Sequence, residues 1–177
     1  MHINNNVLIV FSCLLSQALF STHASGLAGW GTVNMQGSII DTACAIAVDD
    51  REQNIDMGVI PVADIIRDGQ GRSQAFSIEL VNCVLERPGK EGWKHFQVTF
   101  DGDTEGELFG IRGRASGVGL QIADDLGNIV SPGKALPFAD ITLGNRQLNY
   151  SLKLVANHHA VKSGDYFSSI RFKLDYF

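Results

Sequence analysis

"SGDYFSSIRFKLDYF", residues 163–177, closes the chain and decides the predicted fold. Every second position from 166 onward belongs to one face: Tyr166, Ser168, Ile170, Phe172, Leu174 and Tyr176. Arg171, Lys173 and Asp175 alternate with that face. A period of two predicts a half-buried β-strand. We therefore expect the sequence to stop on an amphipathic strand, with nothing after it to turn back and cover it.

Similar alternation recurs in short runs upstream, at 31–39, 74–83, 95–100, 117–124 and 147–155. Turn-forming pairs separate the runs, among them Asp68-Gly69, Pro88-Gly89 and Gly144-Asn145. Many short strands with this punctuation predict an all-β sandwich. Residues 61–69 are the one stretch with helical character, for a turn or two at most.

The first residues have the layout of a secretory signal peptide, residues 1–24. A polar start precedes an apolar run from Val7 to Phe20, and Thr22-His23-Ala24 forms a small-residue cleavage site. The run is shorter than the ~20 residues that a spanning helix needs. The mature chain then has the length of one domain. Its net charge of −5 argues against nucleic acid, which requires a concentrated basic surface.

Two cysteines remain after cleavage, Cys44 and Cys83. In a secreted chain, one such pair predicts a disulfide bond. Neither cysteine has a neighbouring histidine that would favour zinc binding or nucleophilic chemistry.

Candidate chemical sites are weak. Residues 101–107 begin like a calcium loop, but the twelfth position is Arg112 where a bidentate Glu is needed, so a hairpin tip is favoured. His158-His159 could hold a metal and Trp30 or Trp93 could stack on a sugar; loop and packing roles are the simpler interpretations. No catalytic constellation emerges. We expect no enzyme activity, no metal, no cofactor and no small-molecule substrate.

Over the whole mature chain, the sequence resembles the pilin subunits of the chaperone–usher pathway of Gram-negative bacteria. The resemblance rests on "GTVNMQGSIIDTAC" at 31–44, "IDMGVIP" at 55–61, "FSIELVNC" at 76–83 and the closing strand. In that strand Gly164 is fourteenth from the end and Tyr176 is penultimate, both at family positions.

The resemblance implies an incomplete immunoglobulin-like sandwich that lacks its last strand. A donor strand from a periplasmic chaperone, and later from a neighbouring subunit, would complete it. The expected acceptor groove and chaperone contact involve Gly164, Ile170, Phe172, Leu174 and Tyr176. Leaving such apolar side chains in water costs roughly 1.5–3 kcal/mol each, and the open edge invites strand addition.

The resemblance also implies a donor-strand arm at residues 25–38, before a pilin domain at 39–177. Gly31, Val33, Met35 and Gly37 would face a neighbour's groove; the alternative is that 31–38 begins the protein's own first strand. Expected partners are the chaperone, an outer-membrane usher and other pilins.

Within the family, residues 55–65 and 118–137 most resemble the minor subunit that terminates and anchors the P-pilus rod. The expected location is a cell-surface pilus, at its outer-membrane base if the subunit is the terminator. An ordinary rod subunit and a carbohydrate-binding adhesin are the alternatives.

Overall fold

The computed structural model describes residues 31–177. Residues 40–177 form one compact unit, and residues 31–39 are described separately from it. The expected signal peptide, Trp30 and the first part of the expected arm lie outside the described residues. Within 31–177, no helix is long and apolar enough to cross a membrane.

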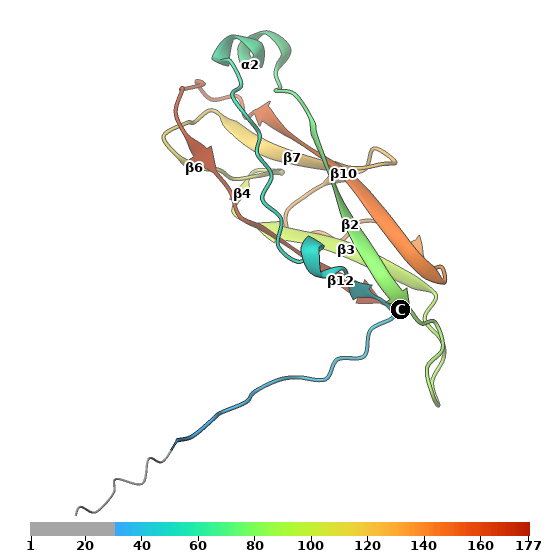
Figure 1. The fold of residues 1–177 in the computed structure, drawn as a ribbon. Helices are drawn as coiled ribbons and strands as arrows, with labels where there is room; N and C mark the ends of the chain where they lie inside the picture. The colour runs from blue at the N-terminus through green and yellow to red at the C-terminus, as the bar shows by residue number, and fades with distance from the viewer. Residues whose placement is uncertain (1–30) are drawn as a thin grey trace, which may run out of the picture. The chain divides into compact units, whose positions relative to one another are not determined.

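A large antiparallel sheet forms one layer of the unit (Figure 1). Its strands follow the order β1 (Ala45–Ile46), β2 (Gln74–Cys83), β10 (Gly144–Ala156), β7 (Val118–Asp124), β5 (Leu108–Phe109) and β4 (Thr104–Glu105), and β8 (Ile129–Val130) pairs with β7. The three long central strands are those that the sequence alternation predicts. The calcium-like stretch is a hairpin tip, since β4 and β5 pair across it.

The second layer is smaller. It contains β12 (Ile170–Tyr176), β3 (His95–Gly102) and β9 (Ala139–Asp140), while β11 (Tyr166–Phe167) pairs separately with β6 (Arg112–Gly113). A single strand was predicted over 166–176, and that prediction was wrong in one respect. The strand is interrupted at Ser168 and Ser169, where its partner changes from β6 to β3 and the Ser168 hydroxyl donates to the Gly110 carbonyl at 2.7 Å.

The core lies between the layers, because alternate side chains of β2, β7 and β10 face those of β3. Phe100 of β3 is at its centre, with its ring centroid 5.0 Å from Tyr150 and 6.0 Å from Phe172. The predicted all-β, immunoglobulin-like sandwich is confirmed.

The helix η1 (Val48–Asp50) is a single 3-10 turn, and α2 (Val62–Asp68) is the short helix expected at 61–69. Pro61 precedes the first turn of α2, and Gly69 ends it in the left-handed conformation that glycine adopts without strain. Gly69 also donates its N–H to the Ile65 carbonyl at 2.9 Å. In Figure 1, α2 lies at the end of this unit opposite the C-terminus.

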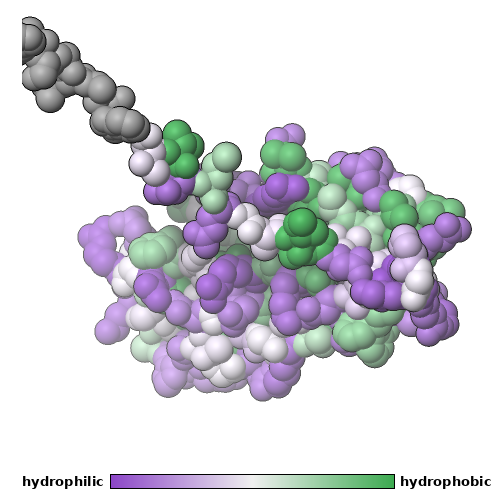
Figure 2. Space-filling model, turned by 90° about the horizontal axis from the view of Figure 1, so that it is seen from below, coloured by the Kyte–Doolittle hydropathy of each residue, from purple (hydrophilic) through white to green (hydrophobic). Residues whose placement is uncertain are grey.

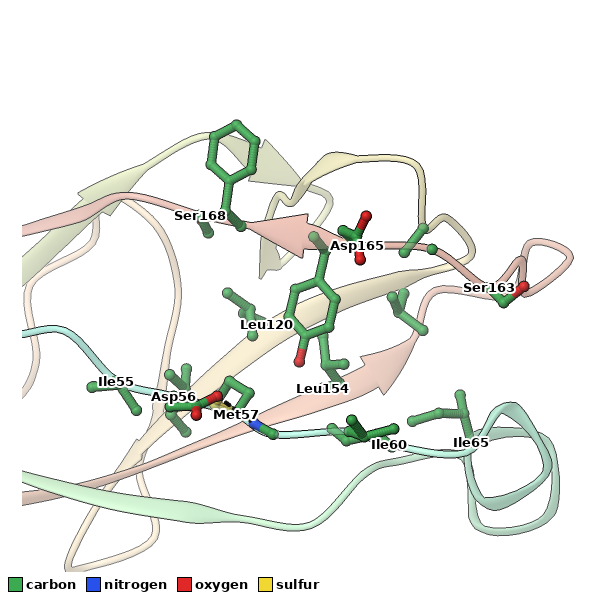
Figure 3. Close-up of a pocket in the computed structure, with 18 of the residues that line it drawn as sticks. Ile55, Asp56, Met57, Ile60, Ile65, Leu120, Leu154, Ser163, Asp165 and Ser168 are labelled. Carbon is green, nitrogen blue, oxygen red and sulfur yellow. Dashed lines mark hydrogen bonds between the residues drawn. The ribbon is translucent and has the colours of Figure 1, made fainter.

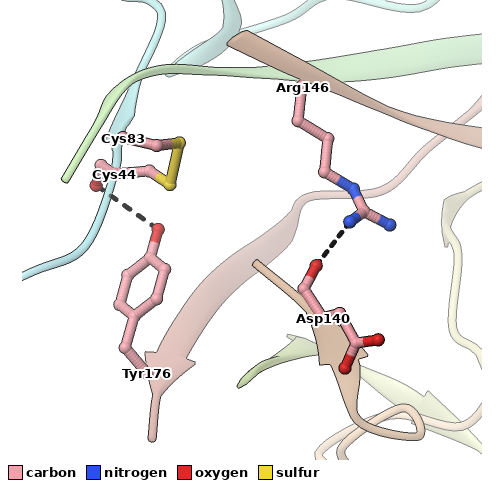
Figure 4. Close-up of a disulfide and its surroundings, with 5 residues drawn as sticks. All are labelled: Cys44, Cys83, Asp140, Arg146 and Tyr176. Atoms are coloured by element: carbon pink, nitrogen blue, oxygen red, sulfur yellow. Dashed lines mark hydrogen bonds between the residues drawn. A yellow bond between two sulfur atoms is a disulfide. The ribbon is translucent and has the colours of Figure 1, made fainter. Parts of the chain in front are cut away.

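The predicted disulfide between Cys44 and Cys83 is present (Figure 4). It joins the segment before β1 to the end of β2. Residues 31–44 contain no strand, so the strand expected from the alternation at 31–39 is not formed, and β1 is the first strand within residues 31–177.

Candidate functional site

A groove of about 810 Å³ runs between two segments that are distant in sequence (Figure 3). One rim is residues 53–60, and the other is residues 161–168 with Ile170. The side chains of Val118, Leu120, Leu152 and Leu154 form its floor. It is the candidate site because its floor is apolar and because it lies beside β12, a strand at the edge of its sheet.

The floor follows from the register of β7 and β10. Leu120 is directly opposite Leu154, and Ile122 is opposite Leu152, so their side chains share one face. Leu120 and Leu154 are 4% and 3% exposed although they line the groove. Other side chains therefore already cover the floor.

The groove is continuous with β12, because Ile170, the first residue of this strand, lines it. One edge of β12 is open. Among the described residues, β12 pairs only with β3. His95 and Phe177 exchange both backbone hydrogen bonds, at 2.9 and 3.1 Å. Since antiparallel pairs alternate between bonded and non-bonded, the N–H and C=O groups of Ile170, Phe172, Leu174 and Tyr176 point toward the open edge.

The inward side chains of β12 are also incompletely covered. Ile170, Phe172 and Leu174 are half-buried, whereas their partner strand contributes fully buried residues such as Phe100. An added strand would pair with the free backbone groups and cover these side chains together.

The rim at residues 53–60 is extended but is assigned to no strand. Ile55, Met57 and Ile60 pack against the core from this rim. The Asp56 carboxylate accepts the Gly58 N–H at 2.8 Å, which fixes a local turn. Residues 55–61 carry part of the family resemblance, but their role as a rim was not predicted. The alternating Ile55 and Met57 were the available signal.

Gly164 lines the groove where two chain segments meet closely. A Cβ at this position would lie 2.7 Å from the backbone nitrogen of Ala115 and 2.7 Å from the Arg114 carbonyl carbon. Only glycine allows this approach without displacement of the backbone.

The other expected groove residues are spread along β12. Ile170 lines the groove, whereas Phe172 and Leu174 lie further along the strand. Tyr176 lies beyond them, where its hydroxyl donates to the Cys44 carbonyl at 3.3 Å (Figure 4). Burial raises the pKa of this hydroxyl. Tyr176 thus ties the last strand to the segment before β1.

Trp93 has a packing role in this structure. Its ring lies 5.9 Å from that of Tyr176, and the Arg87 guanidinium lies over it at 3.8 Å. The Arg87 side chain also pairs with Asp41 at 2.6 Å and holds the pKa of that carboxyl below its usual range.

The expected arm residues are exposed. Val33 is 85% exposed and Met35 is 91% exposed, and Gly31 and Gly37 have no neighbours at the Cβ position. On the face seen in Figure 2, apolar residues form separate patches among hydrophilic ones.

No group of three or more metal-ligating side chains comes together within residues 31–177. The His158 and His159 pair lies in the loop between β10 and β11.

Comparison with known proteins agrees with this architecture. The family described as "Fimbrial protein" matches residues 33–176. The PRS and PAP fimbrial minor pilin proteins of Escherichia coli are each 36% identical over 151 residues, covering 82% of this chain and 77% of theirs. The major MR/P fimbria protein of Proteus mirabilis (strain HI4320) is 32% identical, covering 84% of this chain and 85% of its own.

Two solved structures share the fold. The P pilus rod subunit PapA superposes with a TM-score of 0.68 at 20% identity, covering 77% of this chain and all of its own. A subunit from a structure of a chaperone–usher pilus that addresses rod uncoiling gives a TM-score of 0.67 at 24% identity, covering 85% and 97%.

Proposed function

The chain belongs to the fimbrial protein family, the pilin subunits of chaperone–usher pili, and on that premise we propose that it is the minor subunit that ends or anchors the rod. As a member of the family it is a structural, non-enzymatic protein of the cell-surface pilus, where subunits assemble with one another.

The observation that carries the finer proposal is the similarity to two minor pilins. The chain is 36% identical to them, compared with 32% for the major MR/P fimbria protein of Proteus mirabilis (strain HI4320) and 25% for the type-1 fimbrial A chain of Escherichia coli (strain K12). The similarity to minor pilins supports a specialised position in the fibre over the role of an ordinary rod subunit.

In the proposed assembly route, a periplasmic chaperone first lays a strand along β12. The open backbone edge and the half-buried Ile170, Phe172 and Leu174 support this step, because one added strand satisfies both. The arm, residues 25–38, enters the groove of another pilin at the outer-membrane usher. The exposure of Val33 and Met35, at 85% and 91%, supports a donor role, since a neighbour's groove would bury these apolar side chains.

Termination requires asymmetry between the two ends of this subunit. The arm fills a neighbour's groove, whereas this subunit's own groove keeps the chaperone strand and resists exchange. Exchange needs an open foothold where an incoming arm begins to pair. A groove without such a foothold keeps the barrier high, so that growth stops at this subunit.

The test compares strand exchange with pilus length. The chaperone-bound protein is mixed with a synthetic arm peptide of a rod subunit, and chaperone release is followed over time. We expect release far slower than from a rod subunit, and we expect deletion of the gene to give longer pili that are shed into the medium. Rapid release together with unchanged pilus length and attachment would identify an ordinary rod subunit.

A further inference from the structure

Tyr166 occupies the groove that a donor strand would enter. It lies on β11, which forms part of one rim, and it lines the cavity while packing against the core. Its hydroxyl is fully buried and has no hydrogen-bond partner among the described residues. Because a buried hydroxyl without a partner is unfavourable, the ring is held there by packing.

The Tyr166 hydroxyl is buried in a groove whose other rim carries a carboxylate. Burial raises the pKa of its hydroxyl, and the negative charge of Asp56 raises it further. Asp56 belongs to residues 53–60, across the groove from β11 (Figure 3). Tyr166 therefore lines the groove from the β11 rim, with Asp56 on the facing rim.

This position also explains the covered floor. Leu120 and Leu154 are nearly fully buried although no donor strand is present. Tyr166 packs against the core cluster that contains both leucines, so its ring contributes to this cover.

We propose that Tyr166 is a plug of the acceptor groove, which an incoming strand must displace. This inference rests on the proposed terminator function, for which it names the residue that obstructs exchange. It makes Tyr166 a specificity-determining residue, because strand exchange requires its ring to leave the groove.

The ring and the hydroxyl have separable effects. Removing the ring opens the floor, so Tyr166→Ala exposes a foothold for an incoming strand. Removing only the hydroxyl leaves the ring in place and abolishes an unpaired buried polar group, so Tyr166→Phe keeps the groove closed. Tyr166→Leu leaves a smaller apolar plug and has an intermediate effect.

The experiment uses the mature protein bound to its chaperone, with a synthetic peptide of residues 27–40 of this chain as the probe. Chaperone release is measured for the wild type and for the three Tyr166 variants. Phe138→Ala is the matched control, since Phe138 is an exposed aromatic residue outside the groove. Formation of the Cys44–Cys83 disulfide checks that each variant has folded.

We expect at least tenfold faster release for Tyr166→Ala, a smaller acceleration for Tyr166→Leu, and no acceleration for Tyr166→Phe or the control.

The inference and the proposed function fail in different ways. Fast exchange of the wild type refutes termination, while the ratio between Tyr166→Ala and the wild type still tests the plug. Slow exchange that Tyr166→Ala and Tyr166→Leu leave within twofold of the wild type overturns the plug and leaves termination standing. Equal acceleration by Tyr166→Phe or by the control also overturns it.

Discussion

Phe172 allows a quantitative test of whether a donor strand covers β12. Its ring lies 6.0 Å from that of Phe100, and its side chain is only half-buried in the chain alone. We expect Phe172→Asp to weaken chaperone capture strongly at pH 7 and much less at pH 5. The reason is that an added strand would bury the new carboxyl, while the free subunit leaves it partly in water.

The magnitude follows from the cost of protonation. A buried carboxyl without a partner has a pKa near 8–9, so it enters the complex neutral. Protonating a free carboxyl of pKa about 3.9 at pH 7 costs about 4 kcal/mol, or about a thousandfold in affinity. Because binding favours the protonated form, affinity is retained at low pH and lost as the pH rises. At pH 5 the same cost is about 1.5 kcal/mol, or about tenfold.

Phe172→Asn is the matched control, because asparagine has nearly the same shape as aspartate and is also polar, but it does not titrate. Both variants lose the apolar contact of Phe172, so the ratio of their affinities isolates the charge. The assay is a titration of chaperone with denatured, refolding subunit at pH 5, 6 and 7, with the wild type measured alongside. We expect the Asn-to-Asp affinity ratio to rise about a hundredfold between pH 5 and pH 7. A ratio that does not change with pH would show that the carboxyl stays in water, and the missing-strand account of β12 would then be wrong.

Three further predictions follow from single contacts in the unit. Replacing Cys44 and Cys83 together by alanine should lower the free energy of unfolding of the donor-complemented protein by about 4 kcal/mol, given the 39-residue separation; a loss under 1 kcal/mol in denaturant titration would count against that. Gly164→Ala should cost about 1–3 kcal/mol, because the new Cβ would meet the Ala115 backbone at 2.7 Å; an unchanged melting temperature would contradict the close approach. Tyr176→Phe should cost about 0.5–1.5 kcal/mol through loss of the hydrogen bond to the Cys44 carbonyl; equal stability of the two proteins would show that this bond contributes nothing.

The sequence by itself determined the local elements and the chemistry of the pair of cysteines. Side chains in a strand alternate between its faces, so the alternating apolar and polar residues of β2, β7, β10 and β12 predicted both the strands and their buried faces. Pro61 and Gly69 predicted the limits of α2. Proline restricts the backbone to angles that suit the start of a helix, and glycine allows the left-handed angles that end one. The disulfide followed from counting, since only two cysteines remain after the expected signal peptide.

Only the tertiary structure decided where the strand at 166–176 breaks and what forms the groove. The interruption at Ser168 comes from a change of partner between β6 and β3, which no local period encodes. The rim at residues 53–60 meets residues 161–168 through packing on a shared floor. The Tyr176 hydroxyl meets the Cys44 carbonyl across 132 positions of sequence.

Tyr166 shows the physical reason most clearly. Its alternation predicted an inward side chain, and the structure agrees, but inward at this position is a groove whose facing rim contains Asp56. A period of two is set by the covalent geometry of each residue and its neighbours, so the sequence carries it directly. Which surfaces an inward side chain meets depends on how distant segments minimise exposed apolar area together, and that balance exists only in the folded chain.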